Sequence, residues 1–205
     1  MGPWSHGQQI DEASSLGKIR FDANTALQYR RDVLRPFLDQ YLLDAAPKHD
    51  VAPVTAFETG TNRWQRLAAW PSGCDSGCTT RKQSLYLRAD AGLSFTTPVA
   101  TEASHSEYVS DPAKPIPFTR RPIPAVSYGD DDYWPNWLVD DQRDASSRTD
   151  VLTFVSEPLD APLKIAGEPV AHLFAATSGS DSDWVVKLID VYPDEVPRQP
   201  EMGGY

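Results

Sequence analysis

The chain has 205 residues, a formal net charge of −10 at neutral pH and an isoelectric point near 4.7. This balance argues against a nucleic-acid partner, because binding a phosphate backbone depends on clustered lysine and arginine, and the arginines here are scattered among acidic residues. No stretch approaches the roughly 18 apolar residues that span a bilayer, so we expect no membrane partner, and the length predicts two domains of about 100 residues each.

The first motif is GPWSHGQ, residues 2–8, which places His6 in a loop. Gly2 and Pro3 impose an irregular backbone, and Trp4 supplies a large apolar anchor beside the histidine. A histidine held in this way can act as a base near neutral pH, although an ordinary loop histidine has the same appearance. The heptapeptide alone leaves both interpretations open.

Residues 24–44 carry apolar side chains at helical spacings of three, four and seven. The residues on this apolar face are Leu27, Leu34, Phe37, Leu38, Tyr41 and Leu42. Pro36 interrupts the run, because proline lacks an amide hydrogen and disfavours helical geometry at the preceding residue. We therefore expect a kinked helix, or two consecutive helices, with Arg35 outside helical geometry.

A short buried strand is predicted around residues 54–57, followed by an apolar segment up to Pro71. Loop, helix and strand in this order make one unit of an α/β fold, and such a strand needs neighbours to satisfy its backbone. Residues 1–71 are therefore interpreted as part of a larger α/β domain.

Cys74 and Cys78 follow in a loop rich in Gly and Ser, and residues 72–82 form the natural domain boundary. Two cysteines without nearby histidines cannot fill a four-ligand zinc site, so we expect no metal there. A short-loop disulfide, which suits an oxidising compartment, and two free thiols remain alternative states.

From residue 83 onward the sequence changes to short β-branched and aromatic runs separated by turn residues. These runs are residues 85–95, 105–112, 150–159, 163–177 and 183–193. Such spacing without a convincing helix favours an antiparallel sandwich of the jelly-roll type for residues 83–205.

A proline-rich, acidic stretch at residues 111–144 separates the predicted strands. Its aspartates are Asp130, Asp131, Asp132, Asp140, Asp141 and Asp144. Carboxylate oxygens are ligands that calcium prefers, but acidic loops are far more often simply solvated, so no metal is expected. Trp134 and Trp137 in the same stretch either stack on a sugar or pack between domains, and packing is favoured because aromatic rings supply large buried area.

The chain lacks the partners that a catalytic histidine needs, namely a hydroxyl or thiol nucleophile and a carboxylate. Neither GCDSG at residues 73–77 nor TSGSDS at residues 177–182 forms the strand-to-helix elbow G-x-S-x-G. In α/β hydrolases the histidine is the last triad member along the chain, which is the place that His6 occupies. We therefore expect that the chain begins partway through a catalytic domain and is cut at both ends.

Several motifs together resemble one family. The segments that carry the resemblance are residues 2–7, 29–42, 54–71, 85–95, 108–118 and 148–195. They are similar to the serine hydrolases that include cocaine esterase, the α-amino acid ester hydrolases and the glutaryl acylases, allied to the X-Pro dipeptidyl peptidases. The likeness is greatest to the α-amino acid ester hydrolases and covers most of the chain.

The resemblance implies a multidomain fold, α/β plus all-β. Residues 1–71 would be the C-terminal part of an α/β hydrolase domain, and residues 83–205 would form an incomplete jelly-roll sandwich of galactose-binding-like type. Residues 72–82 would be the loop that links the two domains. It also implies that His6 is the triad histidine, with the nucleophilic serine and the triad aspartate upstream of this chain.

The resemblance further implies a substrate contact. In the cocaine esterase branch, an adjacent Leu-Phe pair on a sandwich strand forms part of the acyl-pocket wall. The matching motif here is AHLFAAT, which gives Leu173 and Phe174. Successive strand residues point to opposite faces, so we expect at most one of the two to enter a pocket.

The implied activity is hydrolysis of small-molecule α-amino acid esters or amides, including β-lactam acyl groups, through an acyl-enzyme and without a cofactor. We expect the whole protein to be a homo-oligomer in the periplasm or outside the cell, and the present chain alone to be inactive. The alternative is a noncatalytic β-sandwich module that binds carbohydrate or another protein, with residues 1–70 as a helical adaptor.

Overall fold

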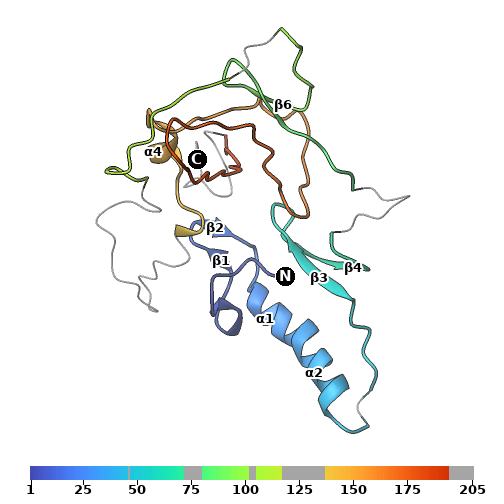
Figure 1. Cartoon of the computed structure of the whole chain (residues 1–205). Coiled ribbons are helices and arrows are strands. Elements are labelled where there is room, and N and C mark those ends of the chain that lie inside the picture. Colours follow the sequence, from blue (N-terminus) through green and yellow to red (C-terminus); the bar gives the residue numbers. More distant parts are fainter. Residues whose placement is uncertain (46, 72–79, 102–104, 117–136, 194–205) are drawn as a thin grey trace.

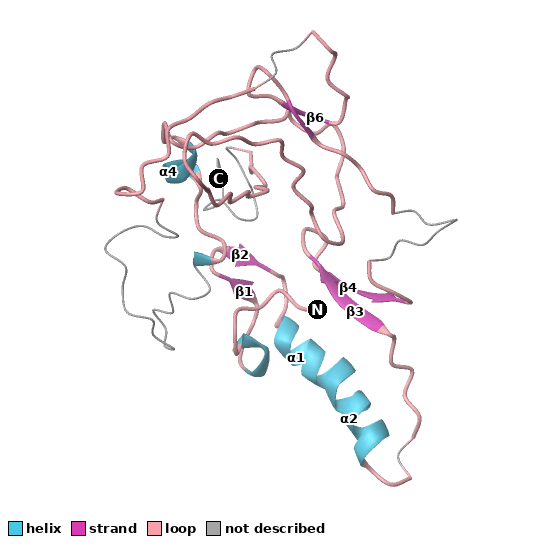
Figure 2. Cartoon of the chain, viewed as in Figure 1, coloured by secondary structure: helices cyan, strands magenta, loops and turns pink. Residues whose placement is uncertain are grey.

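The computed structural model describes residues 1–45, 47–71, 80–101, 105–116 and 137–193. Within these residues, helices and paired strands concentrate before residue 72, whereas the later part is mostly extended chain that arches over one end of the first part (Figures 1 and 2). No helix of this described portion has the length and apolar character needed to cross a membrane.

The chain begins with a short 3₁₀ turn and a small hairpin. The turn η1 covers Gln8–Ile10, and strands β1 (Ser15–Leu16) and β2 (Ile19–Arg20) pair antiparallel. Gly17 sits between the two strands with φ of 54°, a left-handed conformation that glycine adopts without steric cost. This hairpin leads directly into the main helix.

The main helical run has three consecutive parts: α1 (Thr25–Tyr29), the π-helical turn η2 (Arg30–Leu34) and α2 (Arg35–Leu42). Asn24 caps its first turn, since the side-chain oxygen accepts a hydrogen bond from the Leu27 amide at 2.8 Å. The helix predicted over residues 24–44 is therefore confirmed in position.

Two expectations for Pro36 are wrong, namely a break into two helices and an Arg35 outside helical geometry. Arg35 has helical angles, φ −61° and ψ −51°, and the chain does not divide into two helices. Its amide donates to the carbonyl of Arg30, five residues back, so the turn before Pro36 is wider than an α-helical turn. A proline ring clashes with the carbonyl four residues earlier in a regular α-helix, here that of Asp32, and a widened turn relieves this clash.

The apolar face of this helix forms but stays largely in solvent. Leu27, Phe37, Tyr41 and Leu42 are all exposed, with Leu42 at 73%. The rings of Phe37 and Tyr41 contact each other, with centroids 4.8 Å apart. No described element of the chain covers the C-terminal half of this face.

The predicted strand at residues 54–57 is confirmed as β3 (Val54–Glu58), which pairs antiparallel with β4 (Arg63–Leu67). The apolar segment after residue 62 is thus a strand, and five residue pairs join the two. Met1 lies along the other edge of β3, since its amino group donates to the Thr55 carbonyl at 2.6 Å and its carbonyl accepts from the Phe57 amide at 3.0 Å.

Hydrogen-bonded strands are few in the later part of the chain. Strands β5 (Tyr86–Leu87) and β6 (Leu93–Ser94) pair antiparallel, and Gly92 forms an isolated parallel bridge with Val155. The short helix α4 covers Arg143–Ser146. Of residues 150–193, all described, only Val155 belongs to a bridge, so the strands predicted there are not paired into a sheet.

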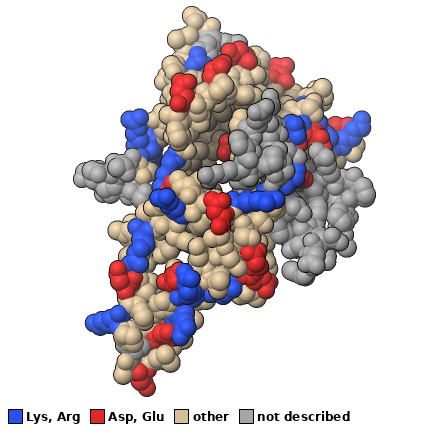
Figure 3. Space-filling model, turned by 180° about the vertical axis from the view of Figure 1, so that it is seen from behind, with Lys and Arg blue, Asp and Glu red and all other residues tan. Residues whose placement is uncertain are grey.

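The two parts of the chain meet at an ion pair between Lys164 and Glu58 at the end of β3. In the view of Figure 3, basic and acidic side chains are interspersed over the visible face and form no large patch of one sign. This distribution agrees with the scatter of arginines among acidic residues in the sequence.

Candidate functional site

His6 lies at an exposed turn between a buried residue and a glycine. Ser5 is buried, His6 is exposed, and Gly7 takes the left-handed angles φ 84° and ψ −22°. The Gln8 amide donates to the Ser5 carbonyl at 3.2 Å and closes the turn around the histidine. The backbone therefore presents the imidazole outward from a short, closed loop.

Trp4 anchors this turn from the N-terminal side. Its indole nitrogen donates to the Thr25 hydroxyl at 2.9 Å, and that hydroxyl donates in turn to the Ala13 carbonyl at 2.8 Å. Thr25 is fully buried at the start of α1. The apolar anchor expected of Trp4 is confirmed. The hydrogen bonds through Thr25 to the Ala13 carbonyl also fix the orientation of the indole ring.

Aromatic rings form a cluster beneath the anchor. Trp64 of β4 lies 5.9 Å from the Trp4 ring, 6.4 Å from Tyr29 and 5.3 Å from Phe57, measured between centroids. Phe57 continues the contact to Phe21, at 5.5 Å. The cluster therefore joins the His6 turn to the helix and to both strands of the larger hairpin.

Arg30 holds the segment that follows the turn. One terminal nitrogen of its guanidinium donates to the carbonyls of Gln9 and Asp11, at 2.8 and 2.9 Å. Sequence reasoning missed this role of Arg30 and the roles of Thr25 and Gln8, because a polar side chain that bonds a backbone carbonyl leaves no periodic signal.

The His6 imidazole makes no hydrogen bond or ion pair within the described part of the chain. A general base requires a hydroxyl or thiol within about 2.6 to 3.2 Å, and a tautomer is usually fixed by a carboxylate. His6 is therefore exposed on a turn closed by hydrogen bonds, without such a partner among the described residues.

Leu173 and Phe174 lie in the extended segment after residue 155. Leu173 is 42% exposed and Phe174 is fully exposed, and no hydrogen bond or ring contact of the described residues joins either to the His6 turn. Neither lines the hollow beside β1 and β2 or the one between the helix and β3. Their role in an acyl pocket stays a prediction.

The cysteine loop lies outside the described residues, and so do Trp134 and the three aspartates at residues 130–132. Cys74 and Cys78 therefore keep both alternatives, disulfide and free thiols. Trp137 is described and half-buried, with its indole nitrogen out of contact with solvent. That burial is typical of packing rather than of a sugar-stacking platform.

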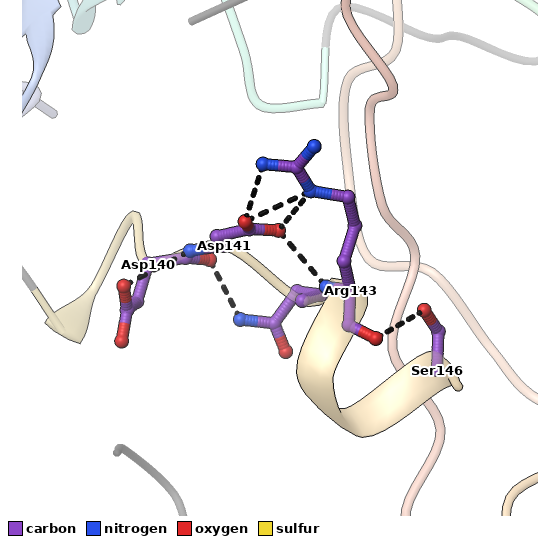
Figure 4. A network of polar contacts seen from close by, with 5 residues as sticks. Asp140, Asp141, Arg143 and Ser146 are labelled. Atoms are coloured by element: carbon purple, nitrogen blue, oxygen red, sulfur yellow. Dashed lines mark hydrogen bonds and ion pairs between the residues drawn. The ribbon is translucent and has the colours of Figure 1, made fainter. Parts of the chain in front are cut away.

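The described aspartates of the acidic stretch are engaged with the chain itself (Figure 4). The Asp141 carboxylate, which is 6% exposed, accepts hydrogen bonds from the Arg143 side chain at 2.8 to 3.1 Å and from the Arg143 amide at 2.9 Å. Gln142 donates to the Asp140 carbonyl at 2.7 Å. No cluster of metal-ligating side chains occurs among the described residues.

Comparisons with known proteins show where the His6 turn lies relative to a known domain family. Residues 48–203 match the family model of the X-Pro dipeptidyl-peptidase C-terminal non-catalytic domain. Leu173 and Phe174 fall inside this match, whereas His6 precedes it. His6, the histidine expected to act as a base, thus lies outside the segment that the family model describes as non-catalytic.

Three proteins show how far the likeness extends. A solved α-amino acid ester hydrolase is 57% identical, with a TM-score of 0.90, over 100% of this chain and 33% of its own. An aminopeptidase from a marine sediment Thaumarchaeota archaeon is 52% identical, with a TM-score of 0.88, over 100% of this chain and 32% of its own. Cocaine esterase of Rhodococcus sp. (strain MB1 Bresler) is 27% identical over 95% of this chain and 33% of its own length.

The chain therefore spans about a third of the length of the relatives it matches. The resemblance found in its motifs is confirmed by the family model, by the curated relative and by the solved structures. The chain belongs to the X-Pro dipeptidyl-peptidase C-terminal domain family, within the group of hydrolases that includes cocaine esterase and α-amino acid ester hydrolase.

Proposed function

We propose that this chain supplies the histidine base of a serine hydrolase that cleaves small-molecule α-amino acid esters and amides, including β-lactam acyl groups. The observation that carries the proposal is the match of the whole chain to an α-amino acid ester hydrolase at 57% identity, with His6 on an exposed and firmly held turn. The serine and the triad carboxylate belong, in this proposal, to hydrolase sequence outside these 205 residues.

The reaction follows from the chemistry of the three groups. His6 takes the proton from the serine hydroxyl as the serine oxygen attacks the substrate carbonyl, and the resulting imidazolium is stabilised by the carboxylate. The imidazolium then gives its proton to the departing alcohol or amine, which leaves an acyl-enzyme. The same imidazole then takes a proton from water as the water attacks the acyl group, and returns it to the departing serine oxygen, which releases the acyl group as an acid and restores the serine hydroxyl.

Residues 83–205 complete, in this proposal, a jelly-roll domain beside the catalytic one, with residues 72–82 as the linker. Most apolar side chains of residues 150–193 face solvent here, which supports strands that pair in a larger assembly. Leu173 or Phe174 would then reach the acyl pocket from this domain. A homo-oligomer in the periplasm or outside the cell remains part of the proposal.

A chimera tests the role of His6. These 205 residues replace the matched third of the α-amino acid ester hydrolase, and hydrolysis of an α-amino acid methyl ester is measured. We expect an active chimera in which His6→Ala lowers kcat by about 10⁴-fold or more, since loss of a triad member removes proton transfer. The unmodified 205-residue chain alone should hydrolyse nothing.

His105→Ala is the matched control. This histidine is exposed and pairs with Glu107 at 3.1 Å, so its loss should leave kcat within about twofold. Equal activity of the His6→Ala chimera and its parent would contradict the proposal. It would favour instead a noncatalytic binding module, the alternative that the family model's description of residues 48–203 also fits.

A further inference from the structure

The side chain of Gln8 bridges the two ends of the His6 turn and ties them to β1. Its amide oxygen accepts from the Ser5 amide at 3.1 Å and from the Ser5 hydroxyl at 3.4 Å. Its amide nitrogen donates to the Ser15 carbonyl at 2.8 Å. One primary amide therefore holds the residue before the histidine and a strand seven positions further along the chain.

We propose that Gln8 is a positioning residue that fixes the His6 imidazole by tying its turn to β1 through both ends of the side-chain amide. The inference rests on the proposed function of His6 as the base. Gln8 itself contacts no reacting atom in this scheme and acts through the turn.

Packing does not hold the tip of the turn, which is why the hydrogen bonds matter. His6 is exposed, and a Cβ placed on Gly7 would find no atom within 4 Å. Gly7 also takes a left-handed conformation. Because glycine has no Cβ, its backbone can move out of this conformation more easily than that of any other residue. The turn that carries the imidazole is therefore held by hydrogen bonds, those between Ser5 and Gln8 and one from the Ile10 amide to the Gly7 carbonyl at 3.2 Å.

The chemistry at this position requires an amide rather than a carboxylate. The oxygen of Gln8 accepts two hydrogen bonds while its nitrogen donates one, and a glutamate can do only the first. Gln8→Glu would direct a carboxylate oxygen at the Ser15 carbonyl, two acceptors without a hydrogen between them. The strand-side attachment is then lost, although the side chain keeps its length.

A displaced base costs rate rather than affinity. Proton transfer needs the imidazole nitrogen within about 2.6 to 3.2 Å of the nucleophile, and a misplacement of about 1 Å can cost about 100-fold. An interaction needed only for the chemical step lowers kcat and kcat/KM together and leaves KM unchanged. These two properties separate positioning of His6 from a general loss of structure or of substrate binding.

The neighbouring glutamine supplies a matched control. The Gln9 side chain makes no hydrogen bond in the described structure, and only its backbone carbonyl is used, by Arg30. In the chimera we expect Gln8→Ala and Gln8→Glu to lower kcat by about 10- to 100-fold at unchanged KM. Gln9→Ala and Gln9→Glu should leave both constants within about twofold. Equal effects of the two glutamines would overturn the inference.

A second measurement uses the 205-residue chain itself and needs no catalysis. Backbone ¹⁵N order parameters of His6 and Gly7 should be near 0.85 in the parent and in Gln9→Ala, and below about 0.6 in Gln8→Ala. Unchanged order in Gln8→Ala would overturn the inference even if the chimera depends on His6. If His6→Ala left the activity of the chimera unchanged, but Gln8→Ala still lowered the order parameters of His6 and Gly7, the proposed function would be refuted. The inference that Gln8 holds the turn against β1 would then stand by itself.

Discussion

Residues 1–71 and residues 150–193 are both rich in apolar side chains, but only the first region buries any of them completely. In the first region Phe21 is 2% exposed and its ring joins an aromatic cluster, whereas in the second region Phe174 is 103% exposed. The first region contains a helix and a five-pair hairpin that cover each other on one side. The second is extended chain that reaches a strand only at Val155.

The difference shows what each region requires from its surroundings. A helix satisfies its own backbone, and the β3–β4 hairpin satisfies one edge of each strand, so the first region orders itself with local partners. An extended segment satisfies its backbone only against other strands, and the relatives are about three times as long as this chain. The His6 turn belongs to the region that builds its own support.

The largest expected effect comes from the buried ring. Phe21→Ala should lower the free energy of unfolding of the first region by about 3 to 5 kcal/mol, because it removes a fully buried ring and leaves a cavity. Phe174→Ala removes the same ring from a fully exposed position, so the free energy of unfolding should change by no more than about 0.5 kcal/mol. Urea titration monitored by hydrogen exchange of the β3 and β4 amides measures both. Similar losses in the two variants would contradict the comparison.

A smaller effect should follow from the buried hydroxyl below Trp4. Thr25→Val keeps the shape but leaves the indole nitrogen of Trp4 without its acceptor and removes one of the two donors to the Ala13 carbonyl, which keeps the Thr25 amide at 3.0 Å. We expect a loss of about 1 to 3 kcal/mol, measured by the same titration. Thr177→Val is the control, since its exposed hydroxyl only accepts from the Gly179 amide and water replaces it. An equal loss in the control would mean that burial does not distinguish the two regions.

Local signals located the helix and β3 of the first region, but not β1, β2 or β4. The spacing of apolar residues located the helix, and β-branched and aromatic residues located β3, because both patterns reflect burial within a few residues of each other. The prediction for Arg35 and Pro36 failed because the rule that proline breaks a helix assumes α-helical hydrogen bonds. The chain instead forms a π-helical turn before Pro36 and stays helical. The widened turn depends on three-dimensional crowding that the spacing does not encode.

The site was predictable only in part, for a related reason. The motif GPWSHGQ pointed to His6, and the structure places it on an exposed turn anchored by Trp4. The support from Thr25 and Arg30 joins residues about 20 positions apart through one or two hydrogen bonds each, which no local pattern records. The strands predicted after residue 150 have the expected composition, but pairing depends on partners that this part of the chain does not provide within the described residues.

The smallest expected effect concerns the link between the two regions. The side-chain hydrogen bond from Lys164 lowers the pKa of Glu58 below its ordinary value of 4.5, against an opposing effect of burial. A carboxyl whose pKa is lowered in the folded state contributes stability above its ordinary pKa and loses it as the pH falls through the folded value. Lys164→Met should therefore lower the unfolding midpoint slightly at pH 7 and leave it unchanged relative to the parent at about pH 3.

Salt and a second lysine complete this test. The effect of Lys164→Met should shrink in about 1 M NaCl, where the Debye length is about 3 Å and exposed charges are screened. Lys187→Met is the control, because Lys187 donates to the neutral amide of Gln142 at 2.6 Å, and its effect should not follow the titration of a carboxyl. If Lys164→Met had the same effect at both pH values, the ion pair with Glu58 would not be what holds the extended region to β3, and apolar contact between the regions would have to account for their arrangement.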